Sequence, residues 1–243
     1  MQNNIGFDIL DNYHIFVLST TDSEKMKTYI IFDLDGTLLN TIDDLAGATN
    51  YALRTMGFPQ HGLWVYPNMV GNGVRKLIER ALPDDQRSEK TINDTLAHFK
   101  EYYGEHCCDA TKPYPGIPEL LADLTARGIN LAVTSNKYED AVTKIISHYF
   151  PNANFRAVLG NIEGIPRKPD PSIVFKALSM CPTPKTEVLY VGDSGVDMET
   201  ARRACVESCG VTWGFRPIVE LQQAYADHII STPSQIIDLV EKQ

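Results

Sequence analysis

A regular alternation of strand-like and helix-like patterns fills the second half of this 243-residue chain and restricts its fold more than any other feature. Short apolar runs predict strands at 129–134, 155–159, 188–191 and 207–211. Amphipathic stretches predict helices near 119–127, 138–150, 172–180 and 196–204. Strands joined through helices pair in parallel, and a parallel sheet needs helices on both faces. We therefore predict an α/β protein with a Rossmann-like parallel sheet and helices on both faces.

A further buried strand is expected far upstream, at 29–32, and a purely helical stretch separates it from the alternation. Thr41 followed by Asp44 is typical of a capping box at a helix start, and Gly57 ends that helix. Helical spacing continues to about residue 111, where the proline-rich segment 112–118 begins. The chain is thus expected to combine an α/β core with one inserted, all-helical cap domain.

The domain boundaries follow from these changes of pattern. We place the core at 26–40 and 112–243 and the cap domain at 41–111, with hinges near 39–41 and 111–115. Residues 1–25 are polar and mildly acidic and resemble nothing that follows, so we interpret them as an N-terminal extension. An ordered strand added to the fold is the alternative.

Charge and composition limit the partners of the chain. The net charge of −9 opposes nonspecific binding to nucleic acid or anionic lipid, so an anionic substrate requires a local cationic pocket or a metal. No apolar run is long enough to span a bilayer, and no Lys or Arg precedes Lys25, which argues against a signal peptide. Five cysteines without Cys-x-x-Cys spacing are typical of reduced, buried thiols. We expect a cytoplasmic monomer or homodimer that binds neither nucleic acid nor a membrane.

Polar side chains gather where the predicted strands end. Asp33 and Asp35 follow the first strand, and Asp193 and Asp197 follow the strand at 188–191. Ligands of open α/β sheets bind beyond these carboxyl ends of the strands. Carboxylates that converge there repel each other unless a cation lies among them, and an oxygen-only ligand set favours Mg²⁺ with retained waters.

Four segments of the chain resemble, in the usual order, the four motifs of the haloacid dehalogenase-like hydrolase superfamily. They are Asp33-Leu34-Asp35-Gly36-Thr37-Leu38, Thr134-Ser135-Asn136-Lys137, Arg167-Lys168-Pro169-Asp170 and Gly192-Asp193-Ser194-Gly195-Val196-Asp197. The helical insertion resembles the small cap domain of the same superfamily. The resemblance implies a hydrolase whose reaction takes place at these strand ends.

The chemistry of the residues gives each a role in phosphoryl transfer. Asp33 would attack phosphorus and form an aspartyl-phosphate, while Asp35 would protonate the leaving alkoxide and later deprotonate the hydrolytic water. Ser135 would hydrogen-bond a phosphoryl oxygen, and Lys168 would balance the charge on the transferring group. Ser135 as a helix cap, Thr134 in its place, and Lys168 as a solvated loop lysine are the alternatives.

A metal completes the expected site. Mg²⁺ would be held by Asp33, Asp35 and Asp193, so that a carboxylate is able to approach an anionic ester. Asp197 lies one helical turn beyond Asp193 and is expected to support the site from behind the metal. The alternative for Asp197 is an ordinary acidic residue at a helix N-terminus.

Several further stretches, less specific than the four motifs, narrow the choice of substrate. Dehalogenases of the superfamily lack the second aspartate, so Asp35 indicates phosphoryl chemistry. The stretches 70–77, 79–82, 113–116, 135–137, 214–217 and 226–230 resemble those of phosphoglycolate phosphatases. The resemblance implies a Mg²⁺-dependent phosphomonoester hydrolase whose partner is a small phosphorylated metabolite, and which converts 2-phosphoglycolate to glycolate and phosphate. Ser135 stands where the family more often has Thr, a change that keeps the hydroxyl.

Substrate contacts are expected from both domains. Gly71 would offer free backbone N–H groups at a helix N-terminus, and Arg75 would pair with a substrate carboxylate unless it is a solvated surface arginine. Gly36, Thr37 and Asn136 are the further expected substrate-binding residues.

Other functions remain compatible with the same motifs. A β-phosphoglucomutase-like phosphomutase shares all four, and related pyrophosphatases and sugar phosphatases share several of the less specific stretches. A non-catalytic phosphate-binding regulator is the alternative from another class, although such a protein has no use for Asp35.

Overall fold

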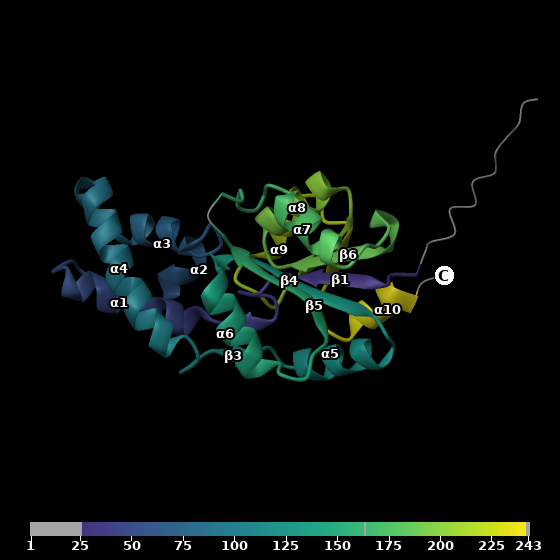
Figure 1. The fold of residues 1–243 in the computed structure, drawn as a ribbon. Helices are drawn as coiled ribbons and strands as arrows, with labels where there is room; N and C mark the ends of the chain where they lie inside the picture. Colours follow the sequence, from purple (N-terminus) through teal and green to yellow (C-terminus); the bar gives the residue numbers. More distant parts are fainter. Residues whose placement is uncertain (1–25, 163, 242–243) are drawn as a thin grey trace, which may run out of the picture.

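A single parallel sheet lies at the centre of the structure, a computed structural model that describes residues 26–162 and 164–241 (Figure 1). The predicted N-terminal extension lies outside the described residues. The sheet has six strands in the order β5-β4-β1-β6-β7-β8, and every pairing is parallel. The strands are β1 (Tyr29–Phe32), β4 (Asn130–Tyr138), β5 (Phe155–Asn161), β6 (Val188–Gly192), β7 (Glu207–Val211) and β8 (His228–Ile230). The predicted parallel sheet is confirmed.

Side chains of β1 alternate between two hydrophobic clusters, one on each face of the sheet. Ile30 and Phe32 pack with α5 (Ile117–Ala126), α6 (Glu139–Tyr149) and α10 (Gln235–Glu241). Tyr29 and Ile31 pack with α7 (Ser172–Met180) and α8 (Gly195–Ala204) on the opposite face. Figure 1 shows these two groups of helices on either side of the strands. All four residues of β1 are buried, and a strand buried on both faces needs a continuous apolar sequence. This explains the run Tyr29-Ile30-Ile31-Phe32.

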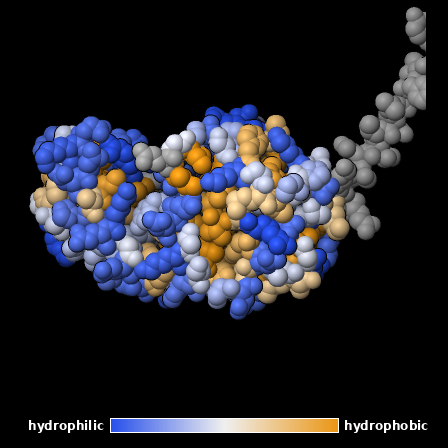
Figure 2. Space-filling view, in the orientation of Figure 1, coloured by the Kyte–Doolittle hydropathy of each residue, from blue (hydrophilic) through white to orange (hydrophobic). Residues whose placement is uncertain are grey.

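The chain leaves the core through a short ribbon and returns through the same ribbon. Strands β2 (Leu39–Asn40) and β3 (Lys112–Pro113) pair antiparallel and frame residues 41–111, which we call the helical insertion. It contains α1 (Ile42–Thr55), η1 (Leu63–Val65), α2 (Tyr66–Met69), α3 (Val74–Ala81), η2 (Asp84–Gln86) and α4 (Glu89–His106). These helices lie beside the core, and their outer surface is mostly hydrophilic (Figures 1 and 2). Their shared interior is built from buried side chains such as Tyr66, Leu77 and Phe99.

The predicted capping box at the start of α1 is wrong. Thr41 makes no side-chain hydrogen bond to the helix, and its hydroxyl donates to Asp35 Oδ1 at 2.5 Å instead. The Asp44 carboxylate accepts from the backbone N–H groups of Ala110 and Thr111, at 2.9 and 2.8 Å. Tertiary partners thus replace the local cap, and they connect α1 to the candidate site and to the returning linker.

Two short elements of the core did not show in the sequence pattern. The helix α9 (Ile218–Gln223) and the strand β8 extend the fold after β7. All five cysteines are free, but Cys205 is exposed, so the expectation that the thiols are buried is wrong for that residue. Across the described residues, the helices are too short or too polar to cross a membrane.

Candidate active site

A cavity lies between the carboxyl ends of the central strands and the helical insertion, with about 50 Å³ of space for water. Its polar lining comes from the core, whereas the insertion contributes mainly apolar side chains. The core residues are Asp33, Asp35, Ser135, Asn136, Lys137, Tyr138, Lys168, Asp193, Ser194, Asp197, Phe215 and Arg216. The insertion residues are Leu45, Val70, Gly71, Gly73, Val74, Leu77, Phe99 and Tyr103. The cavity occupies the position where open α/β sheets bind ligands.

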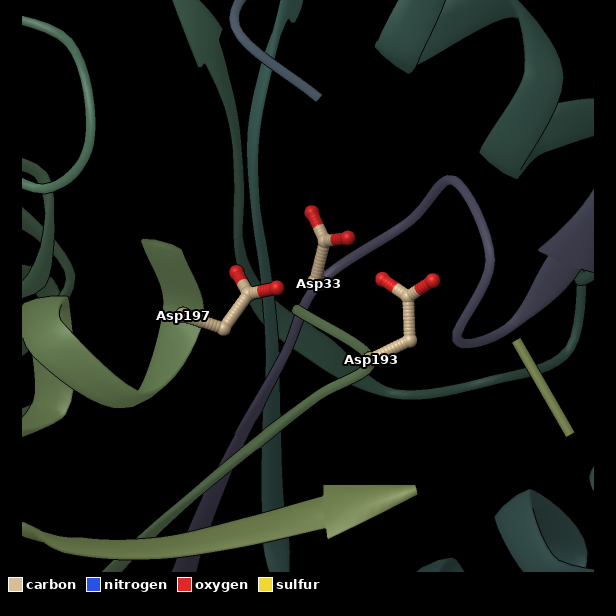
Figure 3. A group of neighbouring side chains, drawn as sticks. All are labelled: Asp33, Asp193 and Asp197. Atoms are coloured by element: carbon tan, nitrogen blue, oxygen red, sulfur yellow. The ribbon is translucent and has the colours of Figure 1, made fainter. Parts of the chain in front are cut away.

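Three buried carboxylates meet in this cavity, with Asp33 between Asp193 and Asp197 (Figure 3). One oxygen of each lies within 4.8 Å of the others. Burial raises the pKa of Asp33 to about 7, since the opposing effect of Lys168 is smaller. Burial and the neighbouring Asp197 and Asp33 raise the pKa of Asp193 well above its usual range. This crowding of oxygen ligands fits a hard cation such as Mg²⁺, which would relieve the repulsion.

Lys168 is a buried ion-pair partner and not a solvated loop lysine. Its Nζ donates to Asp33 Oδ1 at 2.7 Å, to Asp197 Oδ1 at 2.8 Å and to the Thr134 carbonyl at 3.1 Å. Burial lowers the pKa of Lys168, but Asp197 and Asp33 outweigh burial and leave that pKa well above its usual value. A permanent positive charge therefore lies beside the Asp33 carboxylate.

Asp197 is bonded to the protein through both carboxylate oxygens. Oδ1 accepts from Lys168, while Oδ2 accepts from the Ser194 hydroxyl at 2.6 Å and the Ser194 N–H at 3.2 Å. The bond from the Ser194 N–H is one half of a capping box at the start of α8. Asp197 thus caps a helix and pairs with Lys168, while its place behind a bound metal stays a prediction.

Asp193 is fixed by backbone groups that pack tightly around it. The Phe215 N–H donates to Asp193 Oδ2 at 2.7 Å. A Cβ atom at Gly36 would lie 2.2 Å from Asp193 Oδ2, and one at Gly214 would lie 2.3 Å from Asp193 Cβ. Gly36 also has a φ of 91°, a conformation that favours glycine. The backbone at both positions approaches Asp193 more closely than any side chain allows.

Gly36 and Thr37, both expected to contact substrate, are not among the residues that line the cavity. Thr37 is fully buried, and its carbonyl accepts from Trp213 Nε1 at 3.0 Å. The structure therefore places both residues beneath Asp193, where they shape the turn after β1.

Asp35 and Ser135 lie on the side of the cavity nearest the helical insertion. Asp35 Oδ1 accepts from the Thr41 hydroxyl and from Lys137 Nζ, both at 2.5 Å. The Ser135 hydroxyl accepts from the Lys137 N–H at 3.1 Å and lies 3.5 Å from Asp35 Oδ2. Thr134 pairs instead with the hydroxyl of Tyr190 at 2.9 Å and does not line the cavity, so Ser135 presents the available hydroxyl. The Asp35 carboxylate is not part of the group in Figure 3.

Asn136 connects the core to the helical insertion. Its amide donates to the Gly71 carbonyl at 3.0 Å and to the Lys168 carbonyl at 3.2 Å, and its oxygen accepts from the Lys168 N–H at 2.9 Å. Gly71 lines the cavity with a φ of 108°. Asn136 therefore aligns the Lys168 backbone with the entrance to α3.

Arg75 does not reach the cavity. Its guanidinium donates to Asn93 Oδ1 at 2.7 Å and to Glu89 Oε2 at 2.5 Å, on the outer side of the insertion. The arginine that lines the cavity is Arg216, which donates to the Pro67 and Val70 carbonyls at 2.5 and 2.7 Å.

Among the cavity residues that were not predicted as site residues, Arg216, Lys137 and Tyr103 make the contacts that matter most for the site. Arg216 and Lys137 lie in stretches that resemble family sequences, so a signal existed for both. Tyr103 gave no signal, because a buried aromatic residue on a helix has the pattern of an ordinary core residue.

Comparison with known proteins gives consistent matches. Residues 30–211 match the family of haloacid dehalogenase-like hydrolases. A phosphoglycolate phosphatase from Aquifex aeolicus (strain VF5) is 34% identical over 216 residues, which cover 87% of this chain and 96% of the relative. One from Pseudomonas savastanoi pv. phaseolicola is 31% identical over 227 residues, or 90% of this chain and 79% of the relative. A crystal structure from Lactobacillus delbrueckii subsp. bulgaricus, 32% identical, covers 89% of this chain and 99% of its own with a TM-score of 0.83.

Proposed function

The chain belongs to the haloacid dehalogenase-like hydrolases and is a phosphatase, and from that premise we propose that it hydrolyses 2-phosphoglycolate to glycolate and phosphate. The arrangement of Asp33, Asp35 and Lys168 in one small cavity carries the proposal. The names of the two relatives support the choice of substrate.

The reaction we propose has two chemical steps. A carboxylate oxygen of Asp33 bonds to phosphorus while the bond from phosphorus to the glycolate oxygen breaks, and Asp35 gives that oxygen a proton. Water then attacks the aspartyl-phosphate, Asp35 takes its proton, and phosphate leaves with the Asp33 carboxylate restored. Lys168 balances the charge beside Asp33 in both steps, at the 2.7 Å distance of the ion pair.

A bound Mg²⁺ would neutralise charge between the Asp33 carboxylate and the anionic ester. Asp33 and Asp193 are the residues that would hold it, because they are crowded, buried and limited to oxygen donors. Asp197 already uses both oxygens for Lys168 and Ser194, so we assign it to the support of Lys168. The expectation that Asp35 also binds the metal stays a prediction.

We assign the substrate carboxylate to Arg216 in place of Arg75. Arg216 lines the cavity, while Arg75 pairs with Glu89 outside it. Arg216 comes from the core but is held by two carbonyls of the insertion, so its position depends on both parts. A guanidinium at the cavity wall suits a small substrate with a second anionic group.

A comparison of kcat/KM with Mg²⁺ tests the proposal across 2-phosphoglycolate, pyrophosphate, nucleoside monophosphates and sugar phosphates. We expect 2-phosphoglycolate to give the highest value. A preference of about tenfold for any substrate without a carboxylate would refute the substrate assignment. An aspartyl-phosphate that survives for seconds in water would favour a phosphomutase, and no phosphate release from any ester would favour a binding protein.

A further inference from the structure

Lys137 is a buried cation to which the proposed reaction assigns no role. It is 7% exposed, and its ammonium lies between Asp35 Oδ1 at 2.5 Å and the Tyr103 hydroxyl at 2.7 Å. The same ammonium lies 5.0 Å from the centre of the Tyr103 ring. A buried ammonium requires acceptors, and these two groups provide them from different parts of the fold.

The two oxygens of Asp35 have unequal surroundings. Oδ1 accepts two short hydrogen bonds, from Thr41 and Lys137, whereas Oδ2 has the Ser135 hydroxyl at 3.5 Å among the described residues. A carboxyl group that transfers a proton must direct one oxygen at the reacting group and keep it free. Oδ2 is the freer of the two oxygens, and the two bonds to Oδ1 restrict the rotation of the carboxylate in the cavity.

Tyr103 links the position of Lys137, and through it that of Asp35, to the helical insertion. The residue belongs to α4, is fully buried, and stacks on Phe99 with ring centres 5.2 Å apart. Its ring also meets Tyr138 of the core edge-on at 6.4 Å. The position of its hydroxyl is therefore set by the packing of α4, and a displacement of α4 would remove one of the two acceptors that hold Lys137.

We propose that Lys137 is a positioning residue that orients Asp35 for proton transfer, and that Tyr103 of the insertion holds Lys137 in the orienting position. The assignment rests on the proposed function, in which Asp35 exchanges protons with the leaving group and water. Acid–base catalysis by Asp35 thereby depends on where the insertion lies.

A pair of substrates with similar shape and different leaving groups separates this role from a structural one. Phenyl phosphate needs a proton on its leaving oxygen, whereas p-nitrophenyl phosphate releases a stabilised anion without one. The quantity to measure is the ratio of kcat/KM for phenyl phosphate to that for p-nitrophenyl phosphate, since kcat/KM covers the steps up to the first P–O cleavage.

Tyr103→Phe removes only the hydroxyl, and we expect it to lower this ratio by about tenfold, within the range of general acid catalysis. Lys137→Met is expected to lower the ratio further. The matched control is Lys144→Met, because Lys144 Nζ donates to the Gly104 carbonyl at 2.6 Å and so also joins core to α4 without touching Asp35. The control is expected to leave the ratio unchanged.

Equal losses for both esters in Tyr103→Phe would overturn the proposal, as would the same selective loss in Lys144→Met. If Lys137→Met does not fold, Tyr103→Phe alone decides. A wild-type enzyme that cleaves both aryl esters but not 2-phosphoglycolate would refute the substrate assignment and leave the ratio test intact. A wild-type enzyme inactive on every ester would refute the proposed function, and this inference with it.

Discussion

Loss of the Asp33 charge should stabilise the metal-free protein. Burial raises the pKa of Asp33 from its ordinary value of 3.8 to about 7, so the folded protein holds a proton that the unfolded chain releases. The contribution of this proton to the free energy of unfolding is fully present below pH 3.8, and it is lost as the pH rises through about 7. A tenfold difference in proton affinity between the folded and unfolded states corresponds to about 1.4 kcal/mol, so the cost at pH 8 is on the order of 4 kcal/mol.

Asp33→Asn keeps the shape of the side chain and cannot ionise. In EDTA at pH 8 we therefore expect the variant to have a free energy of unfolding a few kcal/mol above that of the wild type. The difference should vanish near pH 4, where the wild-type carboxyl is protonated, and Mg²⁺ should reduce it at pH 8 because a cation stabilises the ionised form.

Urea titrations at several pH values, followed by circular dichroism, measure this difference. The variant should also release no phosphate from any ester, which separates its stability from its activity. A variant less stable than the wild type at pH 8 in EDTA would refute the reasoning, because it would show that the ion pair with Lys168 outweighs burial and repulsion.

The same contacts lead us to expect three further outcomes. Lys168→Met leaves Asp33 and Asp197 without their buried partner, so we expect a loss of about 3–5 kcal/mol in metal-free urea unfolding, together with loss of turnover. Gly214→Ala places a Cβ atom 2.3 Å from Asp193 Cβ, and we expect weaker Mg²⁺ binding in calorimetry. Gly47→Ala is the matched control, because Gly47 lies in α1 with open space around it, and we expect its free energy of unfolding to rise by about 1 kcal/mol. Asp44→Ala removes the acceptor of two N–H groups in the returning linker, and we expect about 1–3 kcal/mol of destabilisation in thermal unfolding and faster proteolysis near residue 110.

The features that could be predicted from the sequence are those that depend on local patterns of residues. The strand before Asp33 and the alternation from Gly116 to β7 depend on neighbouring residues, so the elements predicted there were found in the predicted order. Asp33 and Asp193 met in the cavity because they follow β1 and β6, and neighbouring parallel strands direct their ends to one edge of the sheet. Such features need no knowledge of how the insertion packs.

Contacts between the insertion and the core escaped prediction, because no local signal reports them. Lys137 of β4 meets Tyr103 of α4 only in the folded chain, and Arg216 lines the cavity whereas Arg75 pairs with Glu89 outside it. Thr41 and Asp44 carried a genuine capping pattern, yet acceptors and donors elsewhere in the fold competed successfully for both side chains. The short β8 has three residues, too few for a periodicity to appear.

The central position of β1 has a consequence for synthesis on the ribosome. Its partners β4 and β6 lie roughly 100 and 160 residues later in the chain, as the pairs Tyr29↔Asn130 and Tyr29↔Val188 show. At about 5–20 residues per second, the nascent chain carries the unpaired segment Tyr29–Phe32 for several seconds or longer before both neighbours exist. An apolar strand exposed for that time is a binding site for chaperones and a starting point for aggregation, so the strand that leads into Asp33 is vulnerable during translation.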